Sequence, residues 1–260
     1  AWEEAGSGIP VIALAGLTRT MRDFDFIAPH LDGVRLVRMD ARGRGRSDHA
    51  PWQSYTIGQE AADVVALMDH LGLARAAILG TSRGGLVAMV LAATVPDRLT
   101  GVCLNDIGPV IDRAGLDMIA VHIGRAPGAR SFDEAAAVRA ATHPGFANVP
   151  ERRWRAEVER LYVDTGDGLA INYDPALRDA FLEGVAAASD AWPAFDALAG
   201  KPLALIRGAN SDLLTAETAR AMCRRRPDMH YAEVPDRGHV PWLDEPEAIA
   251  AIRAWLGDLG

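Results

Sequence analysis

The stretch AAILGTSRGGLVAMVLAATVP, residues 76–96, predicts a strand, a tight turn and a helix in succession. It opens with apolar residues typical of a buried strand and closes with a run of helix formers. At the turn between them stands Ser82, with Gly80 before it and Gly84 after it in the pattern G-x-S-x-G. Such a turn exposes the serine Oγ at the end of a sheet, and a Cβ at either glycine would collide with the neighbouring strand or helix. The stretch therefore predicts a nucleophilic serine at position 82.

The composition limits the class of protein. The chain has 260 residues, 49% of them hydrophobic, and a formal net charge of −8, so we expect one large domain or a domain with an insertion. The acidic balance and the lack of a basic run argue against a nucleic-acid partner. The two cysteines match no metal or redox spacing, which favours a reducing, cytoplasmic location. No apolar stretch reaches the ~18 residues of a membrane span.

Apolar runs alternate with amphipathic segments through the first part of the chain. Continuous apolar runs that alternate with helical patterns predict a mostly parallel sheet with helices on both faces, an α/β fold. We expect strands at 11–15, 34–40, 76–80, 99–106, 202–208 and 229–235, and helices at 22–31, 58–72, 84–96, 215–227 and 245–259.

The pattern changes between the two parts of this predicted sheet. Residues 109–199 read as successive helices with no strand among them, the last long one at 175–188. Their amphipathic character suggests that they need a partner surface. We therefore expect a core domain made of residues 1–108 and 200–260, interrupted by a helical insertion at 109–199.

Three further stretches extend the pattern around Ser82. With them the chain resembles the α/β-hydrolase superfamily over nearly its whole length. Within that superfamily it is most similar to small bacterial serine carboxylesterases with a helical cap. The stretch LAGLTRTMRDF (14–24) resembles the loop after the third strand of that fold, although Ala15 stands where histidine is common. DARGRGRSD (40–48) resembles a scaffold loop, and GHVPWLDEP (238–246) resembles the loop that carries the catalytic histidine. The segment before residue 15 resembles a second strand running into the third, so we expect a sheet with fewer than eight full strands.

The resemblance implies roles for two backbone N–H groups and for one histidine. The first amides of the helix after Ser82, led by that of Arg83, are free to stabilise an oxyanion, and the amide of Leu17 would be the second donor. His239 lies after a strand and before the last helix, which puts it at the same sheet edge as Ser82. It would be the general base.

Two aspartates are candidates for the acid that orients this histidine. Asp212 follows the strand at 202–208, where the family commonly has its acid, and gives the chain order Ser, Asp, His. Asp106 follows the strand at 99–106, where some relatives place theirs. We expect Asp212 to contact His239, with Asp106 as the alternative.

The helical insertion falls where the family has its cap, which excludes water and supplies most of the substrate pocket. An arginine near the site, at position 19, 22 or 83, could bind a substrate carboxylate, and pairing with Asp23 or Asp25 is the alternative. The candidate pocket residues are Arg19, His122, Trp154, Trp192 and Val240.

The predicted activity is hydrolysis of a small-molecule carboxylic ester through an acyl-enzyme, with no metal or cofactor, by a monomer or homodimer. Cleavage of carbon–carbon bonds, lactones or thioesters by the same triad stays open. A non-catalytic binding protein that keeps the fold is the alternative of another class.

Overall fold

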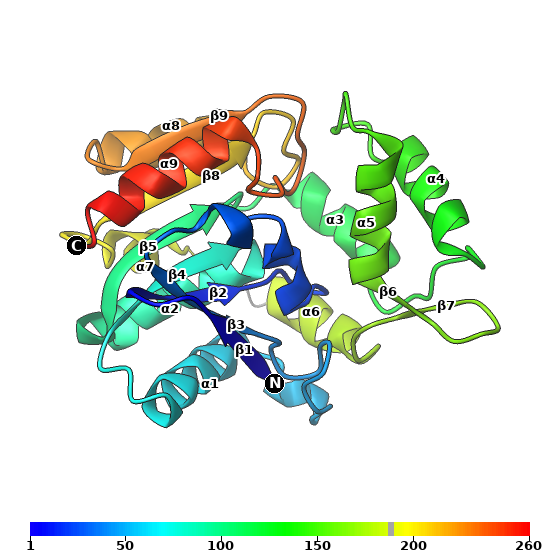
Figure 1. Ribbon diagram of the computed structural model, residues 1–260, viewed down its shortest axis with the longest axis horizontal. Coiled ribbons are helices and arrows are strands. Elements are labelled where there is room, and N and C mark those ends of the chain that lie inside the picture. The colour runs from blue at the N-terminus through cyan, green and yellow to red at the C-terminus, as the bar shows by residue number, and fades with distance from the viewer. Residues whose placement is uncertain (187–189) are drawn as a thin grey trace.

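A seven-stranded sheet in the order β1-β3-β2-β4-β5-β8-β9 forms the centre of the computed structural model, which describes residues 1–186 and 190–260 (Figure 1). Only β1 runs antiparallel to its neighbour, and the other pairs are parallel. The expectation of fewer than eight strands is confirmed. The strands are β1 (Trp2–Ala5), β2 (Ile9–Leu14), β3 (Val34–Met39), β4 (Ala76–Thr81), β5 (Leu99–Asn105), β8 (Leu203–Gly208) and β9 (His230–Val234).

Helices cover both faces of the sheet, as the unbroken apolar strands require. Every residue of β4 and of β8 is buried. One core cluster joins the sheet to α1 (Ile57–His70), α2 (Arg83–Thr94), α7 (Trp192–Asp196) and α8 (Ala216–Arg225). A second cluster joins the opposite face to α9 (Pro246–Gly257) and to the short 3₁₀ helix η1 (Met21–Asp25). Three further 3₁₀ turns are η2 (Ala28–His30), η3 (Trp52–Ser54) and η4 (Pro96–Arg98).

The segment 22–31 is not the single helix that we expected. It forms the two 3₁₀ turns η1 and η2. Pro29 lies in the first turn of η2 and has no N–H to donate, so the chain cannot continue one helical ladder through it. Phe24 and Ile27 still face the core, which explains the helix-like apolar spacing.

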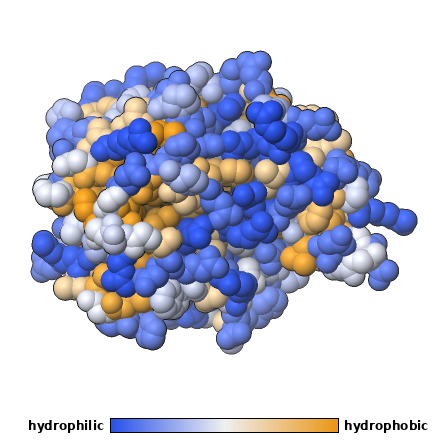
Figure 2. Space-filling model, viewed as in Figure 1, coloured by the Kyte–Doolittle hydropathy of each residue, from blue (hydrophilic) through white to orange (hydrophobic). Residues whose placement is uncertain are grey.

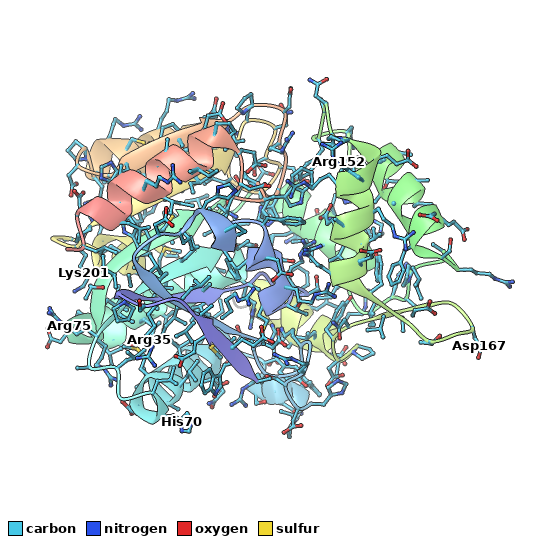
Figure 3. The ribbon with its side chains drawn as sticks, in the orientation of Figure 1. Arg35, His70, Arg75, Arg152, Asp167 and Lys201 are labelled. Atoms are coloured by element: carbon cyan, nitrogen blue, oxygen red, sulfur yellow. The ribbon has the colours of Figure 1, made fainter. Side chains whose placement is uncertain are left out.

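Most of the chain between β5 and β8 forms a second layer, at the right of Figure 1. Contrary to our expectation, this segment contains strands: β6 and β7 form an antiparallel hairpin. Gly166 and Gly168 have positive φ in the turn, and Asp167 projects at its tip (Figure 3). The elements of the segment before α7 are α3 (Arg113–His122), α4 (Phe132–Thr142), α5 (Glu151–Leu161), β6 (Tyr162–Asp164), β7 (Leu169–Ile171) and α6 (Leu177–Ala186).

The last part of the expected insertion packs into the α/β core. Phe195 and Leu198 are fully buried in the same core cluster as α2, and Trp192 packs against that cluster. The second layer therefore ends before α7 rather than at residue 199. Residues 187–188, the end of the helix expected at 175–188, lie outside the described residues.

The face of the molecule seen in Figure 1 carries both hydrophilic and hydrophobic residues. Figure 2 shows hydrophilic residues over much of the visible face, with hydrophobic residues gathered toward its left. Charged residues such as Arg75 and Arg152 lie at the edge of the molecule (Figure 3). Within residues 1–186 and 190–260, none of the helices combines the length and the apolarity that a membrane span needs.

Candidate active site

Ser82 lies in a strained turn between β4 and α2. Its φ is 50° and its ψ is −116°, a conformation that a non-glycine residue adopts only under constraint. A Cβ on Gly80 would lie 2.6 Å from the carbonyl O of Gly84, and a Cβ on Gly84 would lie 2.1 Å from the carbonyl O of Leu14. The two glycines are therefore required by the close approach of β2, β4 and α2, and this approach fixes the direction of the serine side chain.

His239 contacts both the serine and a carboxylate. Its Nε2 lies 2.9 Å from Ser82 Oγ, and its Nδ1 lies 2.7 Å from Oδ2 of Asp106. The three residues follow β4, β5 and β9, so the carboxyl edge of the parallel sheet brings them together. The imidazole is 15% exposed, whereas the Asp106 carboxylate is completely buried.

The expectation that Asp212 contacts His239 is wrong. Asp212 is exposed, and its neighbour Ser211 faces the site instead. Strands β5 and β8 lie side by side, so the loops after both reach the same edge of the sheet. Asp106 has a φ of 55° there, a left-handed conformation that aspartate tolerates better than most residues.

Hydrogen bonds hold the buried Asp106 carboxylate in place. Oδ1 accepts the backbone N–H of Gly208 at 2.8 Å, and Oδ2 accepts the hydroxyl of Ser211 at 2.6 Å. The Ser211 Oγ in turn accepts the backbone N–H of Leu214 at 3.0 Å. A buried charge needs such donors, and Ser211 is a residue of the site that the sequence reasoning missed.

The loop after β2 lies beside the serine. A Cβ on Gly16 would lie 3.7 Å from the Cβ of Ser82. The carbonyl of Gly16 accepts the N–H of Arg19 at 3.2 Å, and the carbonyl of Leu17 accepts Nε of Arg44 at 2.8 Å. Both peptide groups that flank Leu17 are therefore anchored. Arg83 is the first residue of α2, where the backbone N–H has no partner within the helix.

The guanidinium groups of Arg19 and Arg83 are both engaged in ion pairs. Arg19 lies 2.6 Å from Asp23 and 3.2 Å from Glu157 of α5. Arg83 pairs with the buried Glu60 at 2.8 Å. These pairs favour the structural alternative over substrate binding for both arginines, and the partners Glu60 and Glu157 were not foreseen.

The remaining pocket candidates fall in different places. His122 is exposed at the end of α3, and Trp192 packs against Phe195 in the α/β core. Val240 is half-buried next to His239. Of these three candidates, only Val240 lies beside His239; Trp154, the fourth, packs against the loop that carries this histidine.

Trp154 belongs to an aromatic cluster that borders the histidine loop. Its ring centroid lies 5.6 Å from that of Phe146 and 5.8 Å from that of Trp242. Phe146 adjoins Gly238, because a Cβ on that glycine would lie 3.1 Å from the Phe146 ring. Aromatic residues of the second layer thus pack directly beside the residue that precedes His239.

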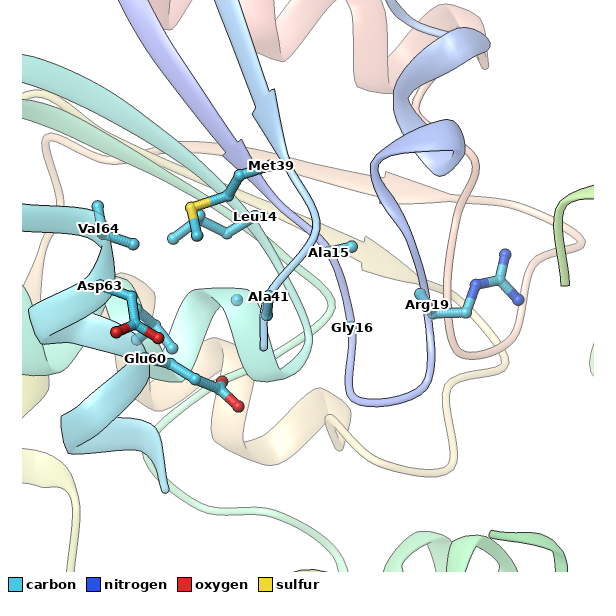
Figure 4. A pocket seen from close by; sticks show the side chains of 11 residues that line it. Leu14, Ala15, Gly16, Arg19, Met39, Ala41, Glu60, Asp63 and Val64 are labelled. Atoms are coloured by element: carbon cyan, nitrogen blue, oxygen red, sulfur yellow. The ribbon is translucent and has the colours of Figure 1, made fainter. Parts of the chain in front are cut away.

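A small cavity lies behind the loop that carries Gly16. Its volume is about 20 Å³, enough for one water molecule. Figure 4 shows this cavity between the loop, strand β3 and helix α1, with Glu60 and Asp63 on one side and Arg19 on the other. Gly84, at the start of α2, also lines it, so the cavity adjoins the supports of the serine turn.

Comparisons with known proteins agree with the fold described above. The alpha/beta hydrolase family model matches residues 11–252. A 3-hydroxybutyrate-oligomer hydrolase of Cupriavidus necator is 34% identical over 96% of this chain and 88% of that protein. A 3-oxoadipate enol-lactonase of Acinetobacter baylyi is 30% identical over 85% of this chain and 78% of that protein. An alpha/beta hydrolase structure from Novosphingobium aromaticivorans has a TM-score of 0.91 at 36% identity, covering 99% of this chain and 92% of that one. The resemblance seen in the sequence is thereby confirmed, and the chain belongs to the alpha/beta hydrolase family.

Proposed function

We propose that the protein is a serine hydrolase that cleaves carboxylic esters with Ser82, His239 and Asp106 as its triad. One observation carries the proposal: the imidazole of His239 lies 2.9 Å from the serine Oγ through one nitrogen and 2.7 Å from a buried carboxylate through the other. A nucleophile, a base within hydrogen-bond reach and an acid that orients the base are the parts that acyl transfer needs.

The reaction follows from this arrangement. Nε2 of His239 takes the proton of Ser82 Oγ as the oxygen attacks the ester carbonyl, and the carbonyl π electrons move onto oxygen. The backbone N–H groups of Leu17 and Arg83 stabilise that oxyanion. The tetrahedral intermediate then collapses, the imidazolium protonates the departing alcohol, and an acyl-enzyme remains. In the second half, Nε2 of His239 takes a proton from a water molecule as the water oxygen attacks the acyl carbon. The second tetrahedral intermediate collapses, the imidazolium returns the proton to Ser82 Oγ, and the carboxylic acid is released.

Asp106 supports both halves of the reaction. Its Oδ2 accepts Nδ1–H of His239, which leaves Nε2 unprotonated and aimed at the serine. The buried negative charge also stabilises the imidazolium that forms in each step. Ser211 and Gly208 supply the hydrogen bonds that keep this carboxylate fixed.

We propose that the second layer, from α3 to α6, is the cap of this active site. Two sets of contacts anchor it. On the histidine side, Asn210 donates to the carbonyl of Gly145 at 3.0 Å. On the oxyanion side, Glu157 of α5 pairs with Arg19. A layer held at both sides of the triad excludes water and forms the walls of the substrate pocket.

The names of two relatives support an ester as the substrate. The relative from Cupriavidus necator is named for hydrolysis of 3-hydroxybutyrate oligomers, whose units are joined by ester bonds. The relative from Acinetobacter baylyi is named as an enol-lactonase, and a lactone is a cyclic ester. Both names favour cleavage of an acyl–oxygen bond, so a short aliphatic hydroxyacid ester is our first candidate and a lactone our second.

A substrate panel tests the proposal. The purified protein would be assayed with p-nitrophenyl acetate and butyrate, the linear dimer of 3-hydroxybutyrate, an enol-lactone, a thioester and a vinylogous diketone. We expect the highest kcat/KM on the esters. Preferential cleavage of the diketone would replace the ester assignment by carbon–carbon bond hydrolysis. A protein inert to the panel and to a fluorophosphonate probe would contradict the enzyme assignment and favour a binding protein.

A further inference from the structure

Glu60 joins two arginines behind the active site. It lies in the first turn of α1, and its side chain is 6% exposed. Its Oε1 accepts Nη1 of Arg44 at 2.7 Å, and its Oε2 accepts Nε of Arg83 at 2.8 Å. Figure 4 shows the carboxylate extending from α1 toward the loop that carries Gly16. One buried carboxylate is thus shared by two cations that come from different parts of the chain.

Each arginine connects Glu60 to one of the proposed oxyanion donors. Arg44 also donates Nε to the carbonyl of Leu17 at 2.8 Å, so it anchors the residue whose N–H is one donor. Arg83 carries the other donor on its own backbone, and its Nη2 is bonded to the carbonyl of Tyr55 at 2.7 Å. The guanidinium fork of each residue makes two or more directed bonds, which lysine cannot reproduce.

We propose that Glu60 is a positioning residue of the oxyanion hole, which holds the N–H groups of Leu17 and Arg83 at a fixed separation through Arg44 and the side chain of Arg83. The inference rests on the proposed function. Oxyanion donors act only when they lie about 2.7–3.1 Å from the place where the negative charge develops. One donor lies in the loop after β2 and the other at the start of α2, so a link between them fixes the positions of both N–H groups around the developing oxyanion.

The electrostatics of the cluster fit this role. Burial raises the pKa of the Glu60 carboxyl, but Arg44 and Arg83 outweigh burial and hold that pKa below its usual range. The carboxylate therefore stays charged near neutral pH. Without it, the buried Arg44 and the partly buried Arg83 would face each other with no carboxylate between them, which is costly, and the segments that carry them would separate.

An aspartate–arginine pair far from the triad offers a control. Asp228 accepts two nitrogen atoms of the buried Arg226, at 2.8 and 2.7 Å. Arg226 also donates to the carbonyl of Lys201, which precedes β8, so this pair lies at the amino edge of the sheet, opposite the triad. Asp228→Asn therefore removes a carboxylate from a buried arginine without touching the site.

The test compares Glu60→Gln, Arg44→Lys and Asp228→Asn on p-nitrophenyl butyrate. For Glu60→Gln and Arg44→Lys we expect kcat to fall about 10- to 100-fold, less than the loss of a whole donor, with KM within about twofold. Affinity for a trifluoromethyl ketone, whose serine adduct carries an oxyanion, should fall by a similar factor. Asp228→Asn should keep both values near those of the wild type.

Hydrogen exchange supplies a readout that does not depend on activity. In both Glu60→Gln and Arg44→Lys, the amides of residues 14–20 should exchange faster than in the wild type, while those of β8 and β9 stay protected. If Glu60→Gln does not fold, Arg44→Lys carries the comparison alone.

The outcomes separate this inference from the proposed function. An active wild type with unchanged ketone affinity and exchange in the folded variants overturns the role of Glu60 and leaves the triad standing. An equal loss of kcat in Asp228→Asn also overturns it, because the effect would then be one of general stability. A wild type that neither hydrolyses esters nor binds the ketone overturns both proposals.

Discussion

Nδ1 of His239 lies 2.7 Å from Oδ2 of Asp106, a carboxylate that follows β5 and precedes the second layer of helices. The histidine and serine come from β9 and β4, and β5 lies between them in the sheet order. The acid therefore sits near the middle of the carboxyl edge, at the point where the chain leaves the sheet to form the proposed cap. The loop after β8 contributes Ser211, which donates to that carboxylate.

Exchanging the two candidate acids for amides distinguishes their roles. Asp106→Asn should lower kcat on p-nitrophenyl butyrate by about 10³- to 10⁴-fold, because the amide cannot enforce the reactive tautomer of His239. Asp212→Asn should leave kcat within about twofold, because that side chain is exposed. Steady-state kinetics on both variants, with thermal melts as the folding control, make the comparison. A larger loss in Asp212→Asn than in Asp106→Asn would refute the acid assignment.

Much of the fold could be predicted from the sequence because its signals are local. The apolar runs of β4 and β5 and the glycines around Ser82 each depend on a few neighbouring residues. His239 could be placed because a loop after a strand and before a helix lies at one known edge of the sheet.

The acid could not be chosen in this way. Asp106 and Asp212 follow adjacent strands, so both loops reach the same edge, and the direction of each side chain depends on the left-handed φ of Asp106. The sequence left a weak signal, since aspartate is one of the few residues that tolerate that conformation.

The hairpin β6–β7 and the role of Glu60 were missed for different reasons. The strands of the hairpin have only three residues each, too few to show a period, although the turn sequence DTGDG was a usable signal. The ion pairs of Glu60 with Arg44 and Arg83 join segments that are far apart in the chain, and a single sequence does not indicate which distant residues make contact.

Because α2 approaches β2 closely at Gly84, we expect any side chain at this position to destabilise the fold. A Cβ there would lie 2.1 Å from the backbone carbonyl of Leu14, which cannot move aside as a side chain can. We expect Gly84→Ala to lower the free energy of unfolding by more than about 2 kcal/mol.

Gly58, in the first turn of α1, is the matched control because nothing lies within 4 Å of its added Cβ. Gly58→Ala should stabilise by about 0.5–1 kcal/mol. Urea melts of both variants give the comparison, and equal midpoints would show that the packing argument fails.

The buried carboxyl of Glu157 should make the free energy of unfolding depend on pH. Burial raises the pKa of its carboxyl, but Arg139 and Arg19 outweigh burial and lower the pKa from 4.5 to about 2. A carboxyl with a lowered folded-state pKa stabilises the fold above its unfolded pKa, and this contribution is lost as the pH falls toward the folded pKa. Glu157→Gln should therefore be less stable than the wild type at pH 7, by about 3 kcal/mol at most, and the difference should shrink between pH 4.5 and pH 2.

Urea melts of the wild type and Glu157→Gln at pH 7, 5 and 3 measure this difference. The amide variant itself serves as the control for lost packing, because it has the shape of the carboxyl but no titration. A difference in stability that stays constant across these pH values would exclude the charge of Glu157 as its source.

The turnover of a short-chain ester by Ser82→Ala shows whether Ser82 is the nucleophile. The substitution removes one hydroxyl from a turn whose shape is fixed by its glycines, so the free energy of unfolding should change by less than about 1 kcal/mol. We expect kcat/KM on p-nitrophenyl butyrate to fall by about 10⁴-fold or more in this folded variant. A folded Ser82→Ala protein that still hydrolyses the ester at close to the wild-type rate would contradict the assignment of Ser82 as the nucleophile.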